Sequence, residues 1–253
     1  MKRTFWILTV SLLVLSALDA SGQRWKLSRY EAEIYLAGVA FHGDIGLADR
    51  PLANMFNGFR PSVGITPRFY VRNNLAVSLD LGYIIYGGHD VEGETHGRVY
   101  TFNSHAFQHF ARLEFYFLGE SAGRGATAIY NRRGMINNFN KLNIYLFAGA
   151  GGILSKSTVK DEEGNEPLAN PGYSNELHYG FGFPVGGGLK MSIDPRLRVG
   201  LELGYQFTTT DWLDGYSPAA SNYNDSYYLL TLKVIYQIRN DRHGKPIFRR
   251  YRR

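Results

Sequence analysis

The chain has 253 residues, of which 44% are hydrophobic and 15% aromatic, and it carries a formal net charge of +6 at pH 7. It contains no cysteine, which excludes disulfides, thiol catalysis and thiolate metal sites. A chain of this length suits a single β domain once an export signal has been removed.

The N-terminus predicts a secretory signal peptide over residues 1–23. The basic pair Lys2-Arg3 precedes an apolar run from Phe5 to Leu18, and small residues follow that run. The run is shorter than the roughly 18 apolar residues that indicate a membrane-spanning helix. We therefore expect an exported chain whose destination is the periplasm, the outer membrane or the outside.

Eight later segments alternate apolar and polar residues, as strands with one apolar and one polar face do. The clearest begins at Leu197 and reads LRVGLELGYQF. A soluble strand has about 5–6 residues, whereas a tilted strand needs roughly 9–11 to cross a bilayer. The lengths predict an all-β, eight-stranded antiparallel transmembrane β-barrel over residues 24–239. In chain order, the predicted strands are 30–40, 59–72, 75–86, 104–118, 142–154, 179–193, 197–209 and 227–239.

The connectors between these strands alternate in length. Asn73-Asn74 and 194–196 are tight turns, whereas the other connectors are long and polar, namely 41–58, 87–103, 155–178 and 210–226. Bacterial barrels have short periplasmic turns and longer extracellular loops, so we place both termini in the periplasm. The connector 119–141 breaks the rule, because it is long and lies on the periplasmic side.

Two basic segments emerge on that side and are candidates for binding a partner. The connector has a net charge of +3 and the tail 240–253 has +5. Their candidate partner-binding residues are Arg124, Arg132, Arg133, Arg242, Lys245, Arg249, Arg250, Arg252 and Arg253. Such charge favours an acidic protein surface or anionic headgroups, and a solubilising tail without a partner is the alternative. Basic residues among aromatics can also bind nucleic acid, but a periplasmic location speaks against it.

The polar face of the predicted strands carries charges of both signs. An eight-stranded barrel is only wide enough to be filled by side chains, and an unpaired buried charge costs several kcal/mol. We therefore predict a structural network of paired charges in the lumen, and no general porin. Its predicted members are Arg60, Arg68, Asp80, Arg112, Glu114, Glu202 and Lys233, with Glu31, Glu33, Lys190 and Arg198 on the same face.

The stretch Phe181–Ser217 carries a more specific signal. A strand with proline and glycines, Pro184–Lys190, is followed by a short turn, the strand Gly200–Gln206 and the loop Thr210–Ser217. This succession resembles the PorG-like outer-membrane barrels of Bacteroidetes, and the start of the mature chain, 24–46, is similar to the family's first strand and loop. The loop departs from the family pattern, because Trp212 stands where tyrosine is usual and Gly215-Tyr216 where Asp-Val is usual.

The resemblance implies an outer-membrane barrel, and it connects the chain to the type IX secretion system, where such barrels associate with a periplasmic ring lipoprotein. The leading hypothesis is a non-enzymatic outer-membrane barrel that anchors a periplasmic assembly and has no cofactor or metal. Its expected partners are outer-membrane lipid and the ring lipoprotein, and no nucleic acid. A small surface barrel, acting in adhesion or envelope integrity through its extracellular loops, is the second hypothesis. A soluble calycin-like barrel, with its apolar face inward around a ligand, is the third.

Two loops contain residues that could support chemistry. One of them contains His89, Asp90, Glu92, Glu94 and His96, which could bind a divalent ion, but their spacing is not diagnostic and we expect a solvated loop. In the other loop, Asp211 and Asp214 flank Trp212. Glycosidase carboxylates need a set separation and a raised pKa. We expect instead exposed carboxylates that accept backbone N–H bonds, with Trp212 and Tyr216 in or above the outer aromatic girdle.

One strand carries a serine and two histidines. His105 and His109 share the apolar face of strand 104–118, whereas Ser104 lies on the other face. A serine and a histidine on opposite faces cannot form a nucleophile–base pair, so we do not expect a lipid hydrolase.

Overall fold

The computed structural model describes most of the barrel and parts of its connectors. The described residues are 29–43, 45, 60–90, 100–117, 129–131, 134–136, 142–167, 172–194, 196–217, 224–238, 240 and 245–246. The predicted signal peptide lies outside them. No helix among the described residues is long and apolar enough to cross a membrane.

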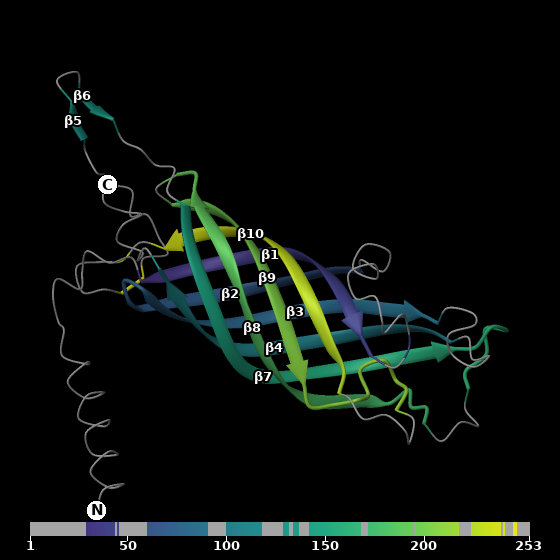
Figure 1. Cartoon of the computed structure of the whole chain (residues 1–253). Helices are drawn as coiled ribbons and strands as arrows, with labels where there is room; N and C mark the ends of the chain where they lie inside the picture. Colours follow the sequence, from purple (N-terminus) through teal and green to yellow (C-terminus); the bar gives the residue numbers. More distant parts are fainter. Residues whose placement is uncertain are drawn as a thin grey trace, which may run out of the picture.

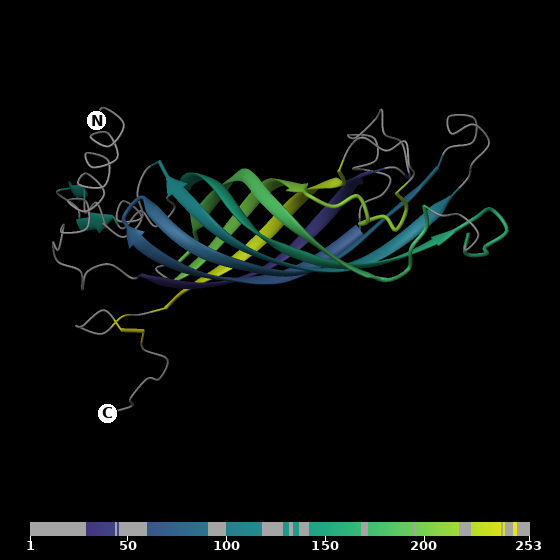
Figure 2. The same cartoon turned by 90° about the horizontal axis from the view of Figure 1, so that it is seen from below.

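Eight long antiparallel strands close into a barrel, in which the last strand pairs with the first (Figures 1 and 2). This confirms the predicted fold class. The strands are β1 (Tyr30–His42), β2 (Arg60–Arg72), β3 (Leu75–His89), β4 (Thr101–Tyr116), β7 (Leu142–Lys160), β8 (Leu177–Ser192), β9 (Leu197–Thr208) and β10 (Ser226–Ile238).

Alternation along each strand places apolar side chains outside and polar ones inside. In β9, Leu201 and Leu203 are 48% and 50% exposed, whereas Glu202 between them is 4% exposed. Exposed large apolar side chains recur on all eight strands, so the closed barrel presents an apolar belt outward. Water cannot cover such a belt at low cost, whereas lipid can. The chain is an outer-membrane barrel, and a soluble barrel with its main apolar face inward does not fit this arrangement.

Three strands run at least three residues farther than the sequence predicts at the extracellular end. β3 ends at His89, β4 begins at Thr101 and β7 ends at Lys160, and their ladders continue to these residues. The predicted loops 87–103 and 155–178 are therefore too long. The reason is that the outward residues beyond the apolar belt are small or polar, so the apolar alternation that marks a membrane strand stops before the strand does.

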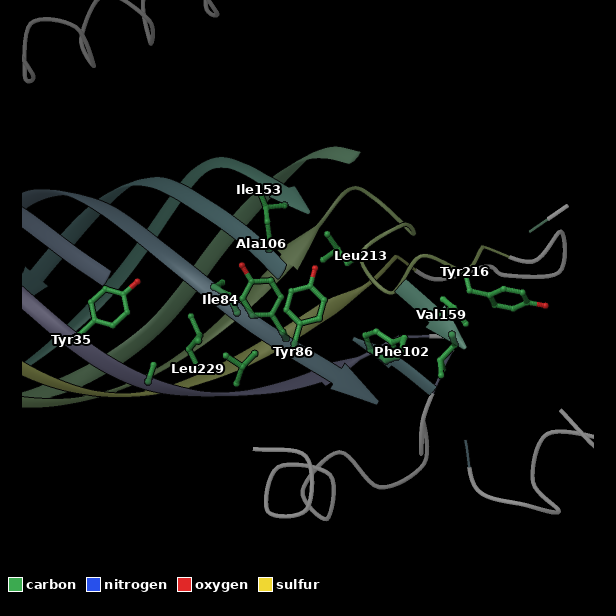
Figure 3. Close-up of a cluster of buried hydrophobic side chains, with 14 residues drawn as sticks. Tyr35, Ile84, Tyr86, Phe102, Ala106, Ile153, Val159, Leu213, Tyr216 and Leu229 are labelled. Atoms are coloured by element: carbon green, nitrogen blue, oxygen red, sulfur yellow. The ribbon is translucent and has the colours of Figure 1, made fainter. Parts of the chain in front are cut away.

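The interior is layered along the barrel axis. β4 shows the order: Phe102 and Ala106 belong to an apolar cluster near the extracellular mouth, Arg112 and Glu114 follow, and Tyr116 lies at the periplasmic end. Figure 3 shows the apolar cluster, with Tyr86, Phe102 and Leu213 gathered toward the mouth. The alternation of residues along the strands predicted the buried charges but not this apolar layer.

A small second sheet lies in the long connector, at the end of the barrel that we predict to face the periplasm. β5 (Ile129–Asn131) and β6 (Gly134–Ile136) pair with each other as a two-stranded sheet that is separate from the barrel (Figure 1). We call this pair the periplasmic hairpin. The alternation pattern did not predict these strands, because three residues are too few to show a period.

Candidate functional site

Ten charged side chains from seven strands meet inside the barrel, and we call them the charge layer. Each is at most 5% exposed, and the five carboxylates equal the five cations in number. Their members are Glu31, Glu33, Arg68, Asp80, Arg112, Glu114, Lys190, Arg198, Glu202 and Lys233. A neutral, fully paired set is what burial of charge requires.

Arg68 is one centre of the charge layer. Its Nη1 donates to Glu31 Oε2 at 3.1 Å, its Nη2 to Glu33 Oε2 at 2.8 Å, and its Nε to Glu114 Oε2 at 2.6 Å. Lys233 Nζ lies 2.8 Å from Glu33 Oε1 and 2.6 Å from Glu202 Oε2. One guanidinium and one ammonium thus link carboxylates from β1, β4 and β9.

The remaining contacts add further cations around Glu31 and Glu202. Glu31 accepts from Lys190 Nζ at 2.8 Å and from Arg198 Nη1 at 2.6 Å, while Arg112 Nη1 donates to Glu202 at 3.0 Å. Tyrosine hydroxyls complete it: Tyr145 donates to Glu202 Oε2 at 2.6 Å. Charge-assisted bonds of this length are among the strongest in proteins.

The charge layer contains six of the seven residues that side-chain parity predicts for the lumen network. Arg60 is the correction: it is exposed as the first residue of β2, although it shares the inward parity of Arg68. The β2–β3 ladder begins only at Ser62, so Arg60 lies at the extracellular rim, beyond the filled interior.

Glycines in β8 make room for the aromatic side chains around the charge layer. A Cβ at Gly188 would lie 2.6 Å from the Tyr145 ring, and one at Gly186 would lie 2.6 Å from the Phe147 ring. The glycine run that the sequence shows in this strand is thus a packing requirement of the lumen.

The loop Thr210–Ser217, which we call the mouth loop, folds into the extracellular opening. Leu213 is fully buried in the apolar cluster, its N–H donates to Asp225 Oδ2 at 2.8 Å, and its carbonyl accepts from Ser104 and Ser157. Gly215 has a φ of +79°, and a Cβ there would lie 2.8 Å from Ser157 Cβ. The mouth loop therefore closes the barrel from outside.

The two carboxylates of the mouth loop differ in exposure. Asp214 is fully buried, accepting from Tyr216 N at 2.9 Å and from Ile45 N at 3.2 Å, so the expectation that it is an exposed carboxylate was wrong. Asp211 is half-buried and accepts from Ser217 Oγ at 2.8 Å. Because Leu213 packs into the apolar cluster, its neighbour Asp214 is buried as well. Backbone N–H groups donate hydrogen bonds to the Asp214 carboxylate there.

Aromatic side chains surround the mouth loop. Trp212 is half-buried and stacks on His178 at 5.1 Å with an interplanar angle of 10°. Tyr216 is buried and packs edge-on against Tyr100, and it pairs with Tyr173 in an isolated bridge. Burial and the hydrogen bond to Glu166 raise the pKa of Tyr173 to about 12.

The residues considered for chemistry lie apart. Ser104 is buried and bonded to Ser157, whereas His105 is exposed on the outward face and bonded to Tyr83. No three His, Asp or Glu residues in the described part of the chain lie close enough to hold a metal ion. In the loop that we expected to be solvated, Asp90 is instead buried and accepts from Tyr100 N at 3.2 Å, and 91–99 are outside the described residues.

The basic periplasmic segments are described only in part. Lys245 is exposed, and its neighbour Pro246 pairs with Asn240 in an isolated bridge. In the connector, the backbone of β5 and β6 flanks Arg132-Arg133. The other candidate residues lie outside the described part, namely Arg124, Arg132, Arg133, Arg242, Arg249, Arg250, Arg252 and Arg253.

No protein-family model and no curated protein matches this chain. Among solved structures it is similar to Neisserial surface protein A, with 13% identity, a TM-score of 0.43, and coverage of 82% of this chain and 96% of that one. It is also similar to Ail, the attachment invasion locus protein of Yersinia pestis, in complex with a heparin analogue (13%, 0.41, 82% and 97%). A third is the N-terminal β-barrel domain of OprF from Pseudomonas aeruginosa (14%, 0.37, 81% and 96%). None of these matches tests the resemblance to PorG-like barrels, which stays a prediction.

Proposed function

We propose that this outer-membrane barrel is a non-enzymatic anchor that holds a periplasmic assembly at the membrane. Its interior supports this proposal, because the charge layer and the mouth loop fill the lumen from both ends. A barrel with a filled lumen acts through its outer surfaces, so the surface that carries extra structure indicates its function.

The observation that carries the proposal is the connector between β4 and β7. The other two hairpins at that end close with tight turns, at Asn73-Asn74 and after Ser192, whereas this connector contains the periplasmic hairpin. An isolated two-stranded hairpin is marginally stable in water. Packing against a partner would stabilise it, which is a reason for the chain to carry such a segment.

The positive charge of these segments and the resemblance to PorG-like barrels narrow the choice of partner. Arg132-Arg133 lie between the two strands of the periplasmic hairpin, and the tail on the same side carries a net +5 over residues 240–253. Both favour a partner with an acidic surface. Together with the likeness to PorG-like barrels, this points to a ring lipoprotein of the type IX secretion apparatus.

Cross-linking in intact cells tests the anchor. The tagged barrel is cross-linked, extracted from the outer membrane and analysed for proteins that co-purify. We expect a periplasmic lipoprotein, whose recovery falls when Arg132 and Arg133 become glutamine and residues 240–253 are deleted. The control Arg60→Gln removes a positive charge at the extracellular end and should leave recovery unchanged. Recovery of the barrel alone, or equal recovery from all variants, contradicts the proposal.

A second function is favoured by the extracellular end. β3, β4 and β7 extend beyond their predicted ends, and the Tyr173–Tyr216 bridge ties the β7–β8 connector to the mouth loop. An ordered outer surface suits a barrel that acts in adhesion or envelope integrity. In that case, exchanging the extracellular loops changes the phenotype of the cells, while deleting the tail does not.

A further inference from the structure

The outward face of the barrel has an uneven distribution of charge. Along the eight barrel strands, the outward positions carry no carboxylate, and at the extracellular end their lysines are Lys156 and Lys160 of β7. Arg60, at the start of β2, has inward parity, whereas Arg72, at its other end, follows a shift of register and pairs with the outward Leu75. The fixed charge at the outward positions of these strands is therefore positive, and at the extracellular end it lies on β7.

Lys156 stands directly above the apolar belt. It is exposed, and the outward residues just below it on β7 are Leu154, Gly152 and Ala150. A lysine in this position extends its aliphatic stem along apolar surface and holds its ammonium at the level of the lipid headgroups.

His105 of β4 lies opposite Lys156 across the strand pair. The two residues are register partners, and both are exposed. His105 Nδ1 lies 2.8 Å from the hydroxyl of Tyr83, and the two rings stack with centroids 6.0 Å apart. When Tyr83 donates to Nδ1, the proton of the imidazole sits on Nε2, which can then donate to an anion. Tyr83 thus orients the His105 ring, and Lys156 is the register partner of His105 on the same face.

The acidic residues that follow β7 lie farther from the membrane than Lys156, whereas Glu176 comes just before Leu177, the register partner of Lys156 on β8, and has the opposite parity. Asp161 follows Lys160 and its Oδ1 accepts from Asn165 N at 2.8 Å, while Glu163 accepts from the Asn165 side chain at 3.4 Å. Lys156 precedes Lys160 by four residues, or about 13 Å along a strand. Asp161 and Glu163 therefore offset Lys160 more than Lys156.

We propose that Lys156 and His105 bind the phosphate group of an outer-leaflet lipid. Positive charge at a membrane surface attracts anionic headgroups, and an ammonium beside an N–H donor matches a phosphate. The position argues for a lipid over a soluble anion, because acyl chains can continue down the same two strands. There, Ala111 and Ala150 are register partners on the outward face, and their small side chains leave space beside the barrel.

Native mass spectrometry of the full-length barrel tests this site. The protein is released from mixed micelles that contain equal amounts of lipid A and chemically dephosphorylated lipid A. We expect preferential retention of the phosphorylated lipid, and about a fivefold lower retention by Lys156→Gln, as the loss of one lysine near a membrane surface predicts. Lys156→Arg keeps the charge and should keep the retention. Arg60→Gln removes a charge at the same end of the barrel, and it should leave retention unchanged.

Other results would overturn the proposal. They are equal retention of both lipids, retention that is unaffected in Lys156→Gln, and loss of lipid A upon addition of millimolar inorganic phosphate, which would indicate a site for the free anion. A heat-dependent shift in gel mobility confirms that each variant is folded before its lipid is measured.

Discussion

Arg68 forms buried ion pairs that no other side chain at this position could reproduce. Its guanidinium bonds three carboxylates, Glu31, Glu33 and Glu114, and all four side chains are fully buried. Without the arginine, the charge layer as a whole would hold five carboxylates and only four cations. The penalty comes from the charges left behind more than from the bonds that are lost.

We predict that Arg68→Met lowers the free energy of unfolding by about 3–5 kcal/mol, the cost of breaking a buried ion pair by removing one partner. Urea unfolding in lipid vesicles, followed by circular dichroism, measures it. Arg60→Met makes the same chemical change at an exposed site and should stay within about 0.5 kcal/mol of the parent. Equal effects at the two positions would mean that the charge layer is not a stabilising unit.

Side-chain parity predicted most of the charge layer and misplaced Arg60. Parity tells which face of a strand a residue occupies, and it placed Arg68, Arg112 and Glu202 inside. It does not tell how far along the axis the interior is filled, and Arg60 lies beyond that limit. The partners of each charge could not be predicted either, because they come from strands far apart in sequence, as Lys190 and Glu31 do.

At the scale of elements, strands were predictable and the mouth loop was not. Alternation over 10 or more residues is a strong signal, and all eight barrel strands followed it. In the mouth loop, the single apolar residue Leu213 determines the conformation by packing into the apolar cluster. One residue has no period, so the inward fold of this loop and the burial of Asp214 could not be inferred from it.

We predict that Gly215→Ala loosens the mouth loop. Alanine at a φ of +79° costs about 1–2 kcal/mol, and its Cβ would also lie 2.8 Å from Ser157 Cβ and 3.0 Å from the Ser174 carbonyl. Hydrogen exchange at the Leu213 amide should therefore become faster. Gly164→Ala is the matched control, because Gly164 has a φ of +84° and nothing within 4 Å of the added Cβ. An equal effect of both substitutions on the Leu213 amide would show that the mouth loop is not held by this contact.

At the scale of the whole molecule, the barrel is closed by two layers of side chains at different depths, and Gln108 bonds to both. The mouth loop and its apolar cluster fill the extracellular half, and the charge layer with Tyr70, Tyr116 and Tyr145 fills the periplasmic half. Their side chains come from different positions on the same strands, so either half remains filled when the other is disturbed.

We predict that the barrel gives no conductance steps in planar lipid bilayers, and that Leu213→Asp gives none either. The substitution opens the mouth by placing a charge in the apolar cluster, but the charge layer still fills an eight-stranded lumen. Conductance in Leu213→Asp but not in the parent would contradict this prediction. It would mean that the mouth loop seals the barrel and that ions can pass through the charge layer.

The pairing of β1 with β10 has a mechanical consequence for a barrel that carries load. These strands are the two ends of the barrel, they pair over 13 residues, and Glu33 on one binds Lys233 on the other at 2.8 Å. A periplasmic pull on the tail would act along β10 and would slide it against β1. Antiparallel hydrogen bonds perpendicular to the strands share such a shear force, and the buried ion pair resists the same displacement. If β10 is pulled along its length, all the bonds between β1 and β10 must break together. The strand pair that closes the barrel is therefore also a place where the barrel can bear tension.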